Sequence, residues 1–528
     1  MNLGIDPCER VREIAVSLTS AQTTDPYVLD GERYKASLRD GRRIVFAGED
    51  VADVTEHAAF RRAIDNLAGF FDAQYDPATR DQLTFVEPES GDRYSTSWLV
   101  SRTRDDLVRR RHALKISTFH TLGAFGRPPY YGSTIAMGYL SLLDKFEAAD
   151  PQFAHNIEGF VSRAAKQNAI CADVLAEPQS DRTIPNNLKP GRLRIVEERS
   201  DGVVLYGAKA VGSVAAIGHF CTIANLLFKD MDPACNIWCV VPVGAENLTL
   251  VARERVTSDS AHEDHPLDAY GDEPDTFFIF DHVFVPWDDV FVHQRPELLG
   301  LYYPICTLAH WHILARLWYR AEIFAGIAQA VVDALGTDPI PGVRSALAEV
   351  FAYAQTLKAF VLAAEEEGEL TAAGVFVPNQ AMTTPGRLLS IEQYPRVMQI
   401  IRDITGQGMI SRFPQSTWQR EEIAGKLEEF MGGHQIAARD KNRIFALAWD
   451  LTCSSHAMRV ALFENVNATP PAWIKEEIYR SYDRAEALQL VHERAGTASG
   501  RPATNGEPER ASTFELIRKE AEQTQPKP

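Results

Sequence analysis

The spacing of hydrophobic and polar residues divides the chain into three successive regions. Up to about residue 165, apolar positions recur with the 3.6-residue period of amphipathic helices, most clearly in Val54–Ala73 and Asp105–Thr118. From about residue 170 to 295 the apolar runs are short and are separated by Asp, Gly, Asn and Pro, the pattern of β-strands joined by turns. From about residue 305 to 490 long helical segments return. This order predicts a helical region, then a β domain, then a helical bundle.

These patterns predict individual elements and domain limits. The expected strands of the β domain are Leu193–Val196, Val203–Tyr206, Cys235–Val241, Leu248–Arg253 and Thr276–Val285. The expected helices of the bundle are Leu308–Leu335, Val343–Glu366, Arg396–Thr405 and Asn442–Glu464. The predicted domains are an N-terminal, mainly helical domain (1–168), a central β domain (169–296), a C-terminal bundle (297–494) and a flexible tail rich in Gly, Pro, Ser and Glu (495–528). Bundles with surplus apolar faces often oligomerise, so a homodimer or homotetramer is expected.

One apolar segment, Ala210–Phe228, is long enough to resemble a membrane span. It contains Gly212, Gly218 and His219, and Lys209 precedes it directly. Glycines inside an apolar run are typical of bends between strands. We therefore predict two buried strands joined by a glycine turn, and no membrane segment.

Composition and charge narrow the class of protein. With 528 residues, of which 45% are hydrophobic, the chain can form one large domain or several packed ones. The formal net charge of −18 argues against binding to nucleic acid or anionic membranes. Acidic residues between Met1 and Val16 argue against a signal peptide. The seven cysteines are odd in number and scattered, which indicates reduced thiols in a cytoplasmic protein: Cys8, Cys171, Cys221, Cys235, Cys239, Cys306 and Cys453.

Several familiar catalytic motifs are missing. No G-x-G-x-x-G follows a strand, and there is no P-loop, no H-E-x-x-H and no G-x-S-x-G. A Rossmann domain, a P-loop enzyme and a serine hydrolase are therefore not expected. His262–His265 and the pair Cys235 and Cys239 lack the second ligand pair that a zinc site needs, so no metal is predicted. His310 and His312, at the start of a helix, are candidates for lining a cavity.

The turn Phe125–Tyr131 is the clearest candidate for a binding site. It places the guanidinium of Arg127 four residues before the phenol of Tyr131, and its glycine and two prolines exclude an ordinary helix interior. A rigid turn with an arginine and a tyrosine suits a site that grips a small, partly anionic organic molecule. The alternative is that the turn forms a corner on the protein surface.

The order of the three regions resembles the acyl-CoA dehydrogenase-type architecture, an α+β fold with an N-terminal helical domain, a central β-barrel domain and a C-terminal helical bundle. Several stretches also resemble the large oxygenase component of the 4-hydroxyphenylacetate 3-monooxygenase family. They extend from about residue 30 to 485 in the family's order. They comprise Gly31–Arg42, Asp53–His57, Ala59–Arg61, Gly126–Tyr131, Ser180–Arg182, Gly207–Lys209, Phe280–Val290 and Arg443–Asp450.

This resemblance implies a reduced-flavin-dependent monooxygenase that hydroxylates an aromatic, phenolic substrate ortho to its hydroxyl group through a flavin C4a-hydroperoxide. FAD would arrive as FADH2 from a separate flavin reductase, with O2 as co-substrate. In the family an Arg and a Tyr four residues apart hold the phenolic oxygen, which places this role on Arg127 and Tyr131. The guanidinium would stabilise the phenolate. The flavin contacts carry over to Gln179, Ser180, Asp181, Arg182, Ser213, His456, Ala457, Met458 and Arg459. For Arg182 and Arg459 the alternative is a salt bridge between domains.

One residue departs from the family pattern. Where the family commonly has a histidine facing the substrate oxygen, this chain has Asp173. A carboxylate there would oppose a phenolate. Asp173 would then point elsewhere, act as a general base, or pair with a cationic group of the substrate; an aspartate turned to solvent or to an arginine is a further alternative. His310 or His312 would supply the missing imidazole.

Other functions remain as alternatives at this point. The site would also suit N-oxygenation of an amine, and the substrate could be a free phenol, a tyrosine derivative or a carrier-protein-tethered aryl acid. An acyl-CoA dehydrogenase-like flavoenzyme would need a catalytic glutamate in the bundle, but Glu365–Glu367 are expected on a solvated helix face. The related radical dehydratases need cysteines that the Arg127 region lacks.

Overall fold

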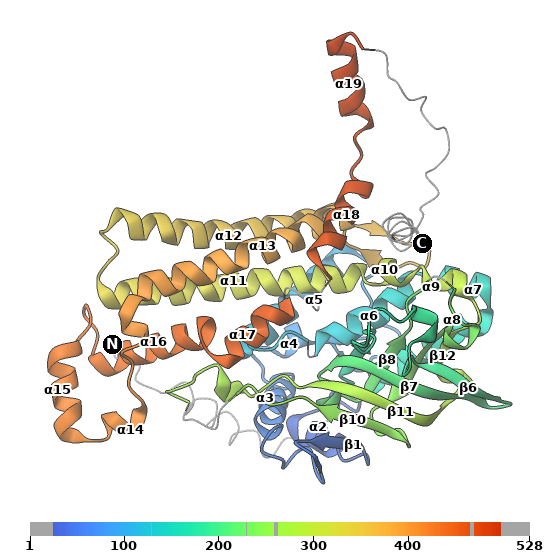
Figure 1. Ribbon diagram of the computed structural model, residues 1–528, viewed down its shortest axis with the longest axis horizontal. Helices are drawn as coiled ribbons and strands as arrows, with labels where there is room; N and C mark the ends of the chain where they lie inside the picture. The colour runs from blue at the N-terminus through green and yellow to red at the C-terminus, as the bar shows by residue number, and fades with distance from the viewer. Residues whose placement is uncertain (1–24, 128, 229, 258–261, 465–468, 498–528) are drawn as a thin grey trace.

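The computed structural model describes residues 25–127, 129–228, 230–257, 262–464 and 469–497 (Figure 1). The predictions for the first residues of the chain and for most of the tail lie outside these ranges. The described part has the predicted order of a helical region, a β region and a helical bundle, and the α+β fold class is confirmed.

The N-terminal region is mainly helical, with two short strands that join the central sheet. Its long helix α5 (Arg104–His120) begins at a capping box, in which Thr103 and Asp106 bond each other's backbone N–H groups. The other helices are α2 (Gly31–Ser37), α3 (Arg61–Asp72), α4 (Arg80–Leu83), α6 (Tyr130–Ser141), α7 (Leu143–Ala149) and α8 (Pro151–Lys166). The strands are β1 (Arg43–Phe46), β2 (Glu49–Asp50), β3 (Thr84–Val86) and β4 (Arg93–Ser95).

The central strands form two sheets. The larger sheet has the order β2-β1-β10-β11-β7-β6 and the smaller one β12-β9-β8-β5. In the long strand β11, Phe278 and Phe280 are buried while Phe277 and Ile279 are exposed. One face of the larger sheet therefore packs on a hydrophobic core, to which the smaller sheet and helix α3 also contribute. The strands are β5 (Cys171–Val174), β6 (Arg194–Arg199), β7 (Gly202–Ser213), β8 (Phe220–Ala224), β9 (Ile237–Pro242), β10 (Leu248–Ala252), β11 (Asp275–Pro286) and β12 (Val290–His293).

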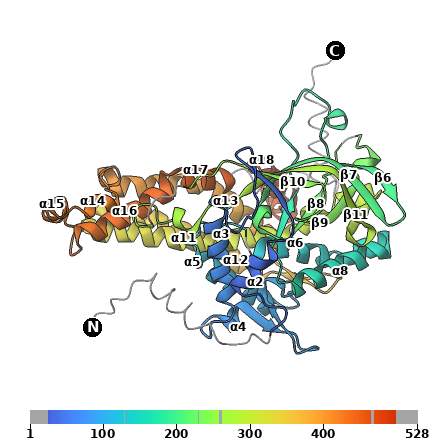
Figure 2. The same cartoon turned by 90° about the horizontal axis from the view of Figure 1, so that it is seen from below.

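The C-terminal region is built on three long helices that lie side by side, α11, α12 and α13 (Figures 1 and 2). The long helices are α11 (Thr307–Leu335), α12 (Pro341–Glu366) and α13 (Gln380–Thr405), and a short hairpin of β13 (Glu369–Leu370) and β14 (Phe376–Val377) precedes α13. The shorter helices are α9 (Pro296–Leu299), α10 (Tyr302–Ile305), α14 (Gln415–Trp418), α15 (Glu421–Met431), α16 (Ala438–Thr452), α17 (Ser455–Leu462), α18 (Pro471–Ser481) and α19 (Ala485–Ala495).

Four sequence predictions need correction. The predicted helix Val54–Ala73 begins only at Arg61. Helix α13 starts at Gln380 and runs through Pro385 and Pro395, because packing against α11 and α12 stabilises a helix that proline weakens locally. The predicted helix Asn442–Glu464 is two helices, because Ser454 caps a new one by accepting from the Ala457 N–H. Glu365 is fully buried rather than solvated, paired with Arg111 at 2.7 Å.

The barrel stays a prediction: the described strands of the β region belong to two sheets, one of six strands and one of four. The apolar segment Ala210–Phe228 contains the end of β7, a 3-10 turn at Ala215–Ile217 and β8, so its reading as buried strands is confirmed. Of the described helices, only α12 is long and apolar enough to cross a membrane, and it packs against α11 and α13. The four domain limits stay predictions.

Candidate functional site

The Arg127 turn lies in the interior of the protein. Arg127 is 6% exposed, and the Tyr131 N–H donates to the Arg127 carbonyl at 2.9 Å as helix α6 begins. The backbone N–H groups of Gly126 and Arg127 both donate to Glu273 Oε1, at 3.0 and 2.8 Å. The Glu273 carboxylate, just before β11, thus holds the backbone of the turn through two charge-assisted hydrogen bonds. The alternative of a surface corner is wrong.

The guanidinium of Arg127 is held between aromatic rings. Its central carbon lies 3.9 Å from the ring centroid of Tyr131 and 4.5 Å from that of Phe463. Within the described residues it has no hydrogen bond or ion pair, because the carboxylates around it are engaged elsewhere. Glu464 pairs with Arg316 and Arg320, while Glu273 pairs with Arg459. A buried guanidinium without a direct ion pair can bind an anion.

Tyr131 and His312 complete this cluster as neutral groups. Their ring centroids lie 5.8 Å apart. Burial raises the pKa of Tyr131, and the nearby Arg127 only partly offsets it. Burial, together with Arg316 and Arg127, lowers the pKa of His312 well below its usual range. Both side chains are therefore neutral at physiological pH and can exchange hydrogen bonds with a ligand.

His310 lies apart from His312, although both are on α11. Residues two positions apart on a helix point to nearly opposite sides. The His310 ring packs against Tyr303, with centroids 5.1 Å apart, and burial lowers its pKa well below the usual value. Of the two predicted histidines, only His312 packs against Tyr131.

Asp173 is turned to two hydroxyl groups. It lies on β5 opposite Thr222 of β8. Thr222 Oγ1 donates to Asp173 Oδ1 at 2.9 Å, and Tyr302 Oη donates to Oδ2 at 2.5 Å. Burial raises the pKa of Asp173, although these hydrogen bonds partly oppose it. The alternative of a carboxylate turned to solvent or to an arginine is wrong, and both oxygens have donors.

Ser213 and Arg459, two of the predicted flavin contacts, meet on the carboxylates in front of β11. Ser213 Oγ donates to Asp275 Oδ1 at 2.6 Å, and Arg459 Nη2 donates to the same oxygen at 2.7 Å. Arg459 Nη1 donates to Glu273 Oε2 at 3.0 Å. Arg459 therefore forms the salt bridge between bundle and β region that was its alternative role. Glu273 connects this network to the Arg127 turn.

The other predicted flavin contacts divide into buried and exposed groups. His456 is 3% exposed, and neither of its ring nitrogens has a hydrogen-bond partner among the described residues. Burial lowers the pKa of His456 to about 4. Ala457 is buried and Met458 is exposed. Gln179, Ser180, Asp181 and Arg182 are all exposed, in the loop between β5 and β6, and among the described residues no hydrogen bond or ion pair joins them to Ser213.

Four residues of this site were missed by the sequence analysis: Glu273, Asp275, Tyr302 and Phe463. The acidic run Asp272-Glu273-Pro274-Asp275 directly before a predicted strand was the available signal for the first two. No local signal marks Tyr302 or Phe463 as a site residue, because an aromatic residue in an apolar segment is usually part of the hydrophobic core.

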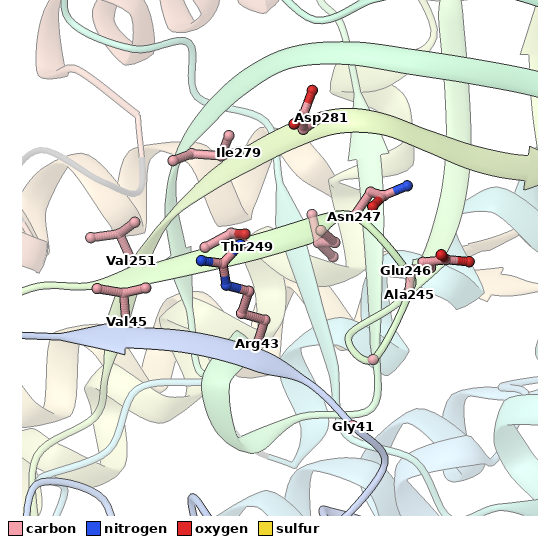
Figure 3. Close-up of a pocket in the computed structure, with 12 residues that line it drawn as sticks. Gly41, Arg43, Val45, Ala245, Glu246, Asn247, Thr249, Val251, Ile279 and Asp281 are labelled. Atoms are coloured by element: carbon pink, nitrogen blue, oxygen red, sulfur yellow. The ribbon is translucent and has the colours of Figure 1, made fainter. Parts of the chain in front are cut away.

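A separate hollow of about 540 Å³ lies on the outer face of the larger sheet (Figure 3). Arg43, Thr249 and Asp281 project into it from β1, β10 and β11. None of the predicted site residues lines it, so we do not assign it to the Arg127 site. In the described part of the chain, no group of three or more His, Cys, Asp or Glu side chains is placed to hold a metal ion.

Comparison with known proteins identifies the family of this chain. The sequence models of the N-terminal and C-terminal parts of 4-hydroxyphenylacetate 3-hydroxylase match residues 30–292 and 301–496. The chain belongs to the 4-hydroxyphenylacetate 3-hydroxylase family. The 4-hydroxyphenylacetate 3-monooxygenase oxygenase component of Thermus thermophilus is a relative, 29% identical over 83% of this chain and 91% of its own.

Two further family members extend the comparison. The oxygenase component of 4-nitrophenol 4-monooxygenase/4-nitrocatechol 2-monooxygenase from Rhodococcus opacus is 32% identical, over 83% of this chain and 85% of its own. The crystal structure of the oxygenase component (HpaB) of 4-hydroxyphenylacetate 3-monooxygenase complexed with FAD matches with a TM-score of 0.84. That match has 27% identity and covers 88% of this chain and 99% of the other.

The residues around α17 fit a flavin as the family's cofactor. A buried imidazole with two unused ring nitrogens, His456, suits a ligand whose ring edge carries both donors and acceptors. Arg459, one helical turn further on, already donates from each guanidinium nitrogen to Glu273 or Asp275, so it would stand beside a flavin as a positive charge rather than as an unused donor. A flavin would therefore be held by α17 and by the Ser213 end of β7.

Proposed function

We propose that this protein is the oxygenase component of a two-component monooxygenase, which uses FADH2 from a separate flavin reductase and O2 to hydroxylate a phenol ortho to its hydroxyl group. The observation that carries this function is Arg127, a buried guanidinium without a carboxylate partner in the described structure, stacked between Tyr131 and Phe463. Such a group binds an anionic oxygen.

Arg127 would bind and ionise the substrate. Its N–H groups donate to the phenolic oxygen, which lowers the pKa of the phenol because a nearby cation favours the charged form. The phenolate is more electron-rich at its ortho carbon than the neutral phenol is. The bound reduced flavin supplies the activation of O2. The chain supplies the oriented phenolate and a site that excludes water.

Tyr131 and His312 would complete the hydrogen bonds of the phenolic oxygen. Tyr131 stays a neutral donor because burial raises its pKa. His312 stays a neutral imidazole, and its buried Nδ1 has no hydrogen-bond partner among the described residues. It can therefore exchange a hydrogen bond with the phenolic oxygen at Nδ1 without becoming charged.

Asp173 would act as a positioning residue rather than as a partner for a cationic substrate. Both of its oxygens already accept from hydroxyl groups. Burial raises its pKa and so makes its charged form less favourable than in water, which weakens repulsion of the phenolate. An amine substrate, and hence N-oxygenation, is not favoured by a site whose unpaired charge is the positive charge of Arg127.

The cofactor contacts would be Ser213, His456, Ala457, Met458 and Arg459, with Gln179–Arg182 approaching from their exposed loop. His310 would lie at the far side of the substrate region. The same hydroxylation would also apply to an aryl substrate that is tethered to a carrier protein.

The six described cysteines are all free thiols, which supports a cytoplasmic protein.

A homodimer or homotetramer is supported by the end of the described chain. Helix α19 projects from the body in Figure 1 and buries no residue within the chain. Leu488, Leu490 and Val491 are 49%, 54% and 60% exposed on it. An amphipathic helix without an internal partner suits a contact with a second copy. Mass measurement of the native protein and of a chain truncated after residue 484 tests this.

The coupling of product to oxygen tests the function. The protein is supplied with a flavin reductase, FAD, NADH and 4-hydroxyphenylacetate or 4-nitrophenol, and catechol product is compared with hydrogen peroxide. Arg127→Ala should lose at least about a hundredfold in coupled product, the scale of a lost positioning group, while FAD affinity is nearly unchanged. Arg127→Lys keeps the charge but loses the planar fork, and should be intermediate. Normal coupling in Arg127→Ala would show that the proposed role is wrong.

A further inference from the structure

Phe463 is placed between the two arginines of the site. It directly follows α17 and is 7% exposed. Its ring centroid lies 4.5 Å from the guanidinium carbon of Arg127 and 4.4 Å from that of Arg459. A Cβ atom added at Gly126 would lie 3.3 Å from Phe463 Cε1, so the ring also packs against the turn itself.

We propose that Phe463 is a positioning residue, which presents the N–H edge of Arg127 to the substrate oxygen and keeps water from the guanidinium. This inference rests on the proposed phenol-binding role of Arg127. Phe463 would increase the effect of the Arg127 charge on the pKa of a bound phenol.

The geometry of a guanidinium explains why its faces matter. The hydrogen-bond donors of arginine all lie in the plane of the group, and its two faces stack on aromatic rings. Tyr131 and Phe463 both stack on Arg127, at 3.9 and 4.5 Å. The donors of the in-plane edge remain for an anion. The substrate oxygen would therefore meet Arg127 at this in-plane edge.

The exclusion of water determines how strongly the charge acts. A charge interacts more strongly with an anion where the local dielectric constant is low. Without the Phe463 ring, water would reach Arg127, and this would weaken the phenolate complex.

Phe463 also belongs to the helix that carries the flavin candidates. His456 and Arg459 lie on α17, and the Arg459 guanidinium contacts the Phe463 ring. The same ring therefore contacts a substrate group on one side and a cofactor group on the other. A residue that only filled space would not need to contact either guanidinium, and leucine could take its place. Leucine cannot replace an aromatic ring that lies against two cations.

Binding of 4-nitrophenol tests the proposal without flavin turnover, because the absorbance of nitrophenolate reports ionisation directly. The probe is titrated into the full-length protein across a pH series, for wild type, Phe463→Leu, Phe463→Tyr and Arg127→Ala. The matched control is Phe284→Leu, since the exposed Phe284 ring lies 5.7 Å from Arg199 on the sheet surface. Thermal unfolding shows whether each variant is folded.

The wild type should lower the pKa of bound 4-nitrophenol. Phe463→Leu keeps an apolar side chain but loses the aromatic face, so nitrophenolate should bind on the order of tenfold more weakly, with a smaller pKa shift. Phe463→Tyr and Phe284→Leu should resemble the wild type. If Phe463→Leu does not fold, Phe463→Met takes its place, because methionine adapts to core gaps.

The outcomes separate this proposal from the function beneath it. If Phe463→Leu binds and ionises the probe like the wild type while Arg127→Ala does not, Phe463 is only a packing residue and the inference is wrong. If Arg127→Ala also behaves like the wild type, the clamp itself is wrong. A wild type that leaves the pKa of the probe unchanged overturns both.

Discussion

Glu464 offers a quantitative test of the charge network around the Arg127 turn. Its side chain is 6% exposed and pairs with Arg316 at 2.8 Å and Arg320 at 2.9 Å. Burial would raise the pKa of Glu464, but the two arginines outweigh it and lower the pKa to about 2. We predict that Glu464→Gln strongly destabilises the protein, because two buried guanidiniums lose their counter-ion.

The pKa of Glu464 sets the magnitude. A fall from 4.5 to about 2 corresponds to about 3 kcal/mol of stability at neutral pH. Removal of one partner from a buried ion pair typically costs about 3–5 kcal/mol, which agrees with this figure. The control is Glu366→Gln, whose ion pair with Arg104 is exposed, with side chains 69% and 47% accessible. That change should cost less than about 0.5 kcal/mol.

Urea unfolding followed by circular dichroism measures both variants from pH 7 to pH 3. Because the folded pKa of Glu464 is depressed, its stabilising effect is complete above pH 4.5, the value in the unfolded chain, and is lost as the pH falls toward 2. The difference between wild type and Glu464→Gln should therefore shrink by more than about half at pH 3. A Glu464→Gln protein as stable as Glu366→Gln at pH 7, or a difference that does not change with pH, would refute the reasoning.

Three further predictions concern neighbouring groups. Asp173→Asn should leave phenol binding intact and remove the pH-dependent repulsion of a phenolate, seen as a flatter pH profile of 4-nitrophenol affinity; a large loss of affinity at every pH would contradict this. Ser213→Ala loses its hydrogen bond to Asp275 and any contact with the cofactor, so FAD titration should show weakening of about fivefold, whereas unchanged affinity would remove Ser213 from the flavin site. Glu365→Gln should lower stability by about 3 kcal/mol through its buried pair with Arg111, without changing the coupling of product to oxygen; a loss of coupling in the folded variant would favour a catalytic glutamate.

Local periodicity was sufficient for the order of elements. The alternation in Thr276–Val285 predicted β11, which the structure places at Asp275–Pro286, because one face of this strand packs on a core and the other does not. The predicted helix Leu308–Leu335 corresponds to α11 within one residue at its start. Helix α13 was predicted too short, because the prolines that argue against a helix locally are overruled by packing against α11 and α12.

The sequence by itself determined that Arg127 and Tyr131 share one rigid turn, since a spacing of four residues at a helix start is a local property. Only the tertiary structure decided what surrounds them. Glu273 bonds the backbone of Arg127 across 146 residues, and Phe463 reaches the same guanidinium from the end of the bundle. It also decided that Arg459 pairs with Glu273 and Asp275, while His310 lies apart from His312. The physical reason is that burial and ionic pairing depend on which distant elements pack together, and no local pattern of residues contains that information.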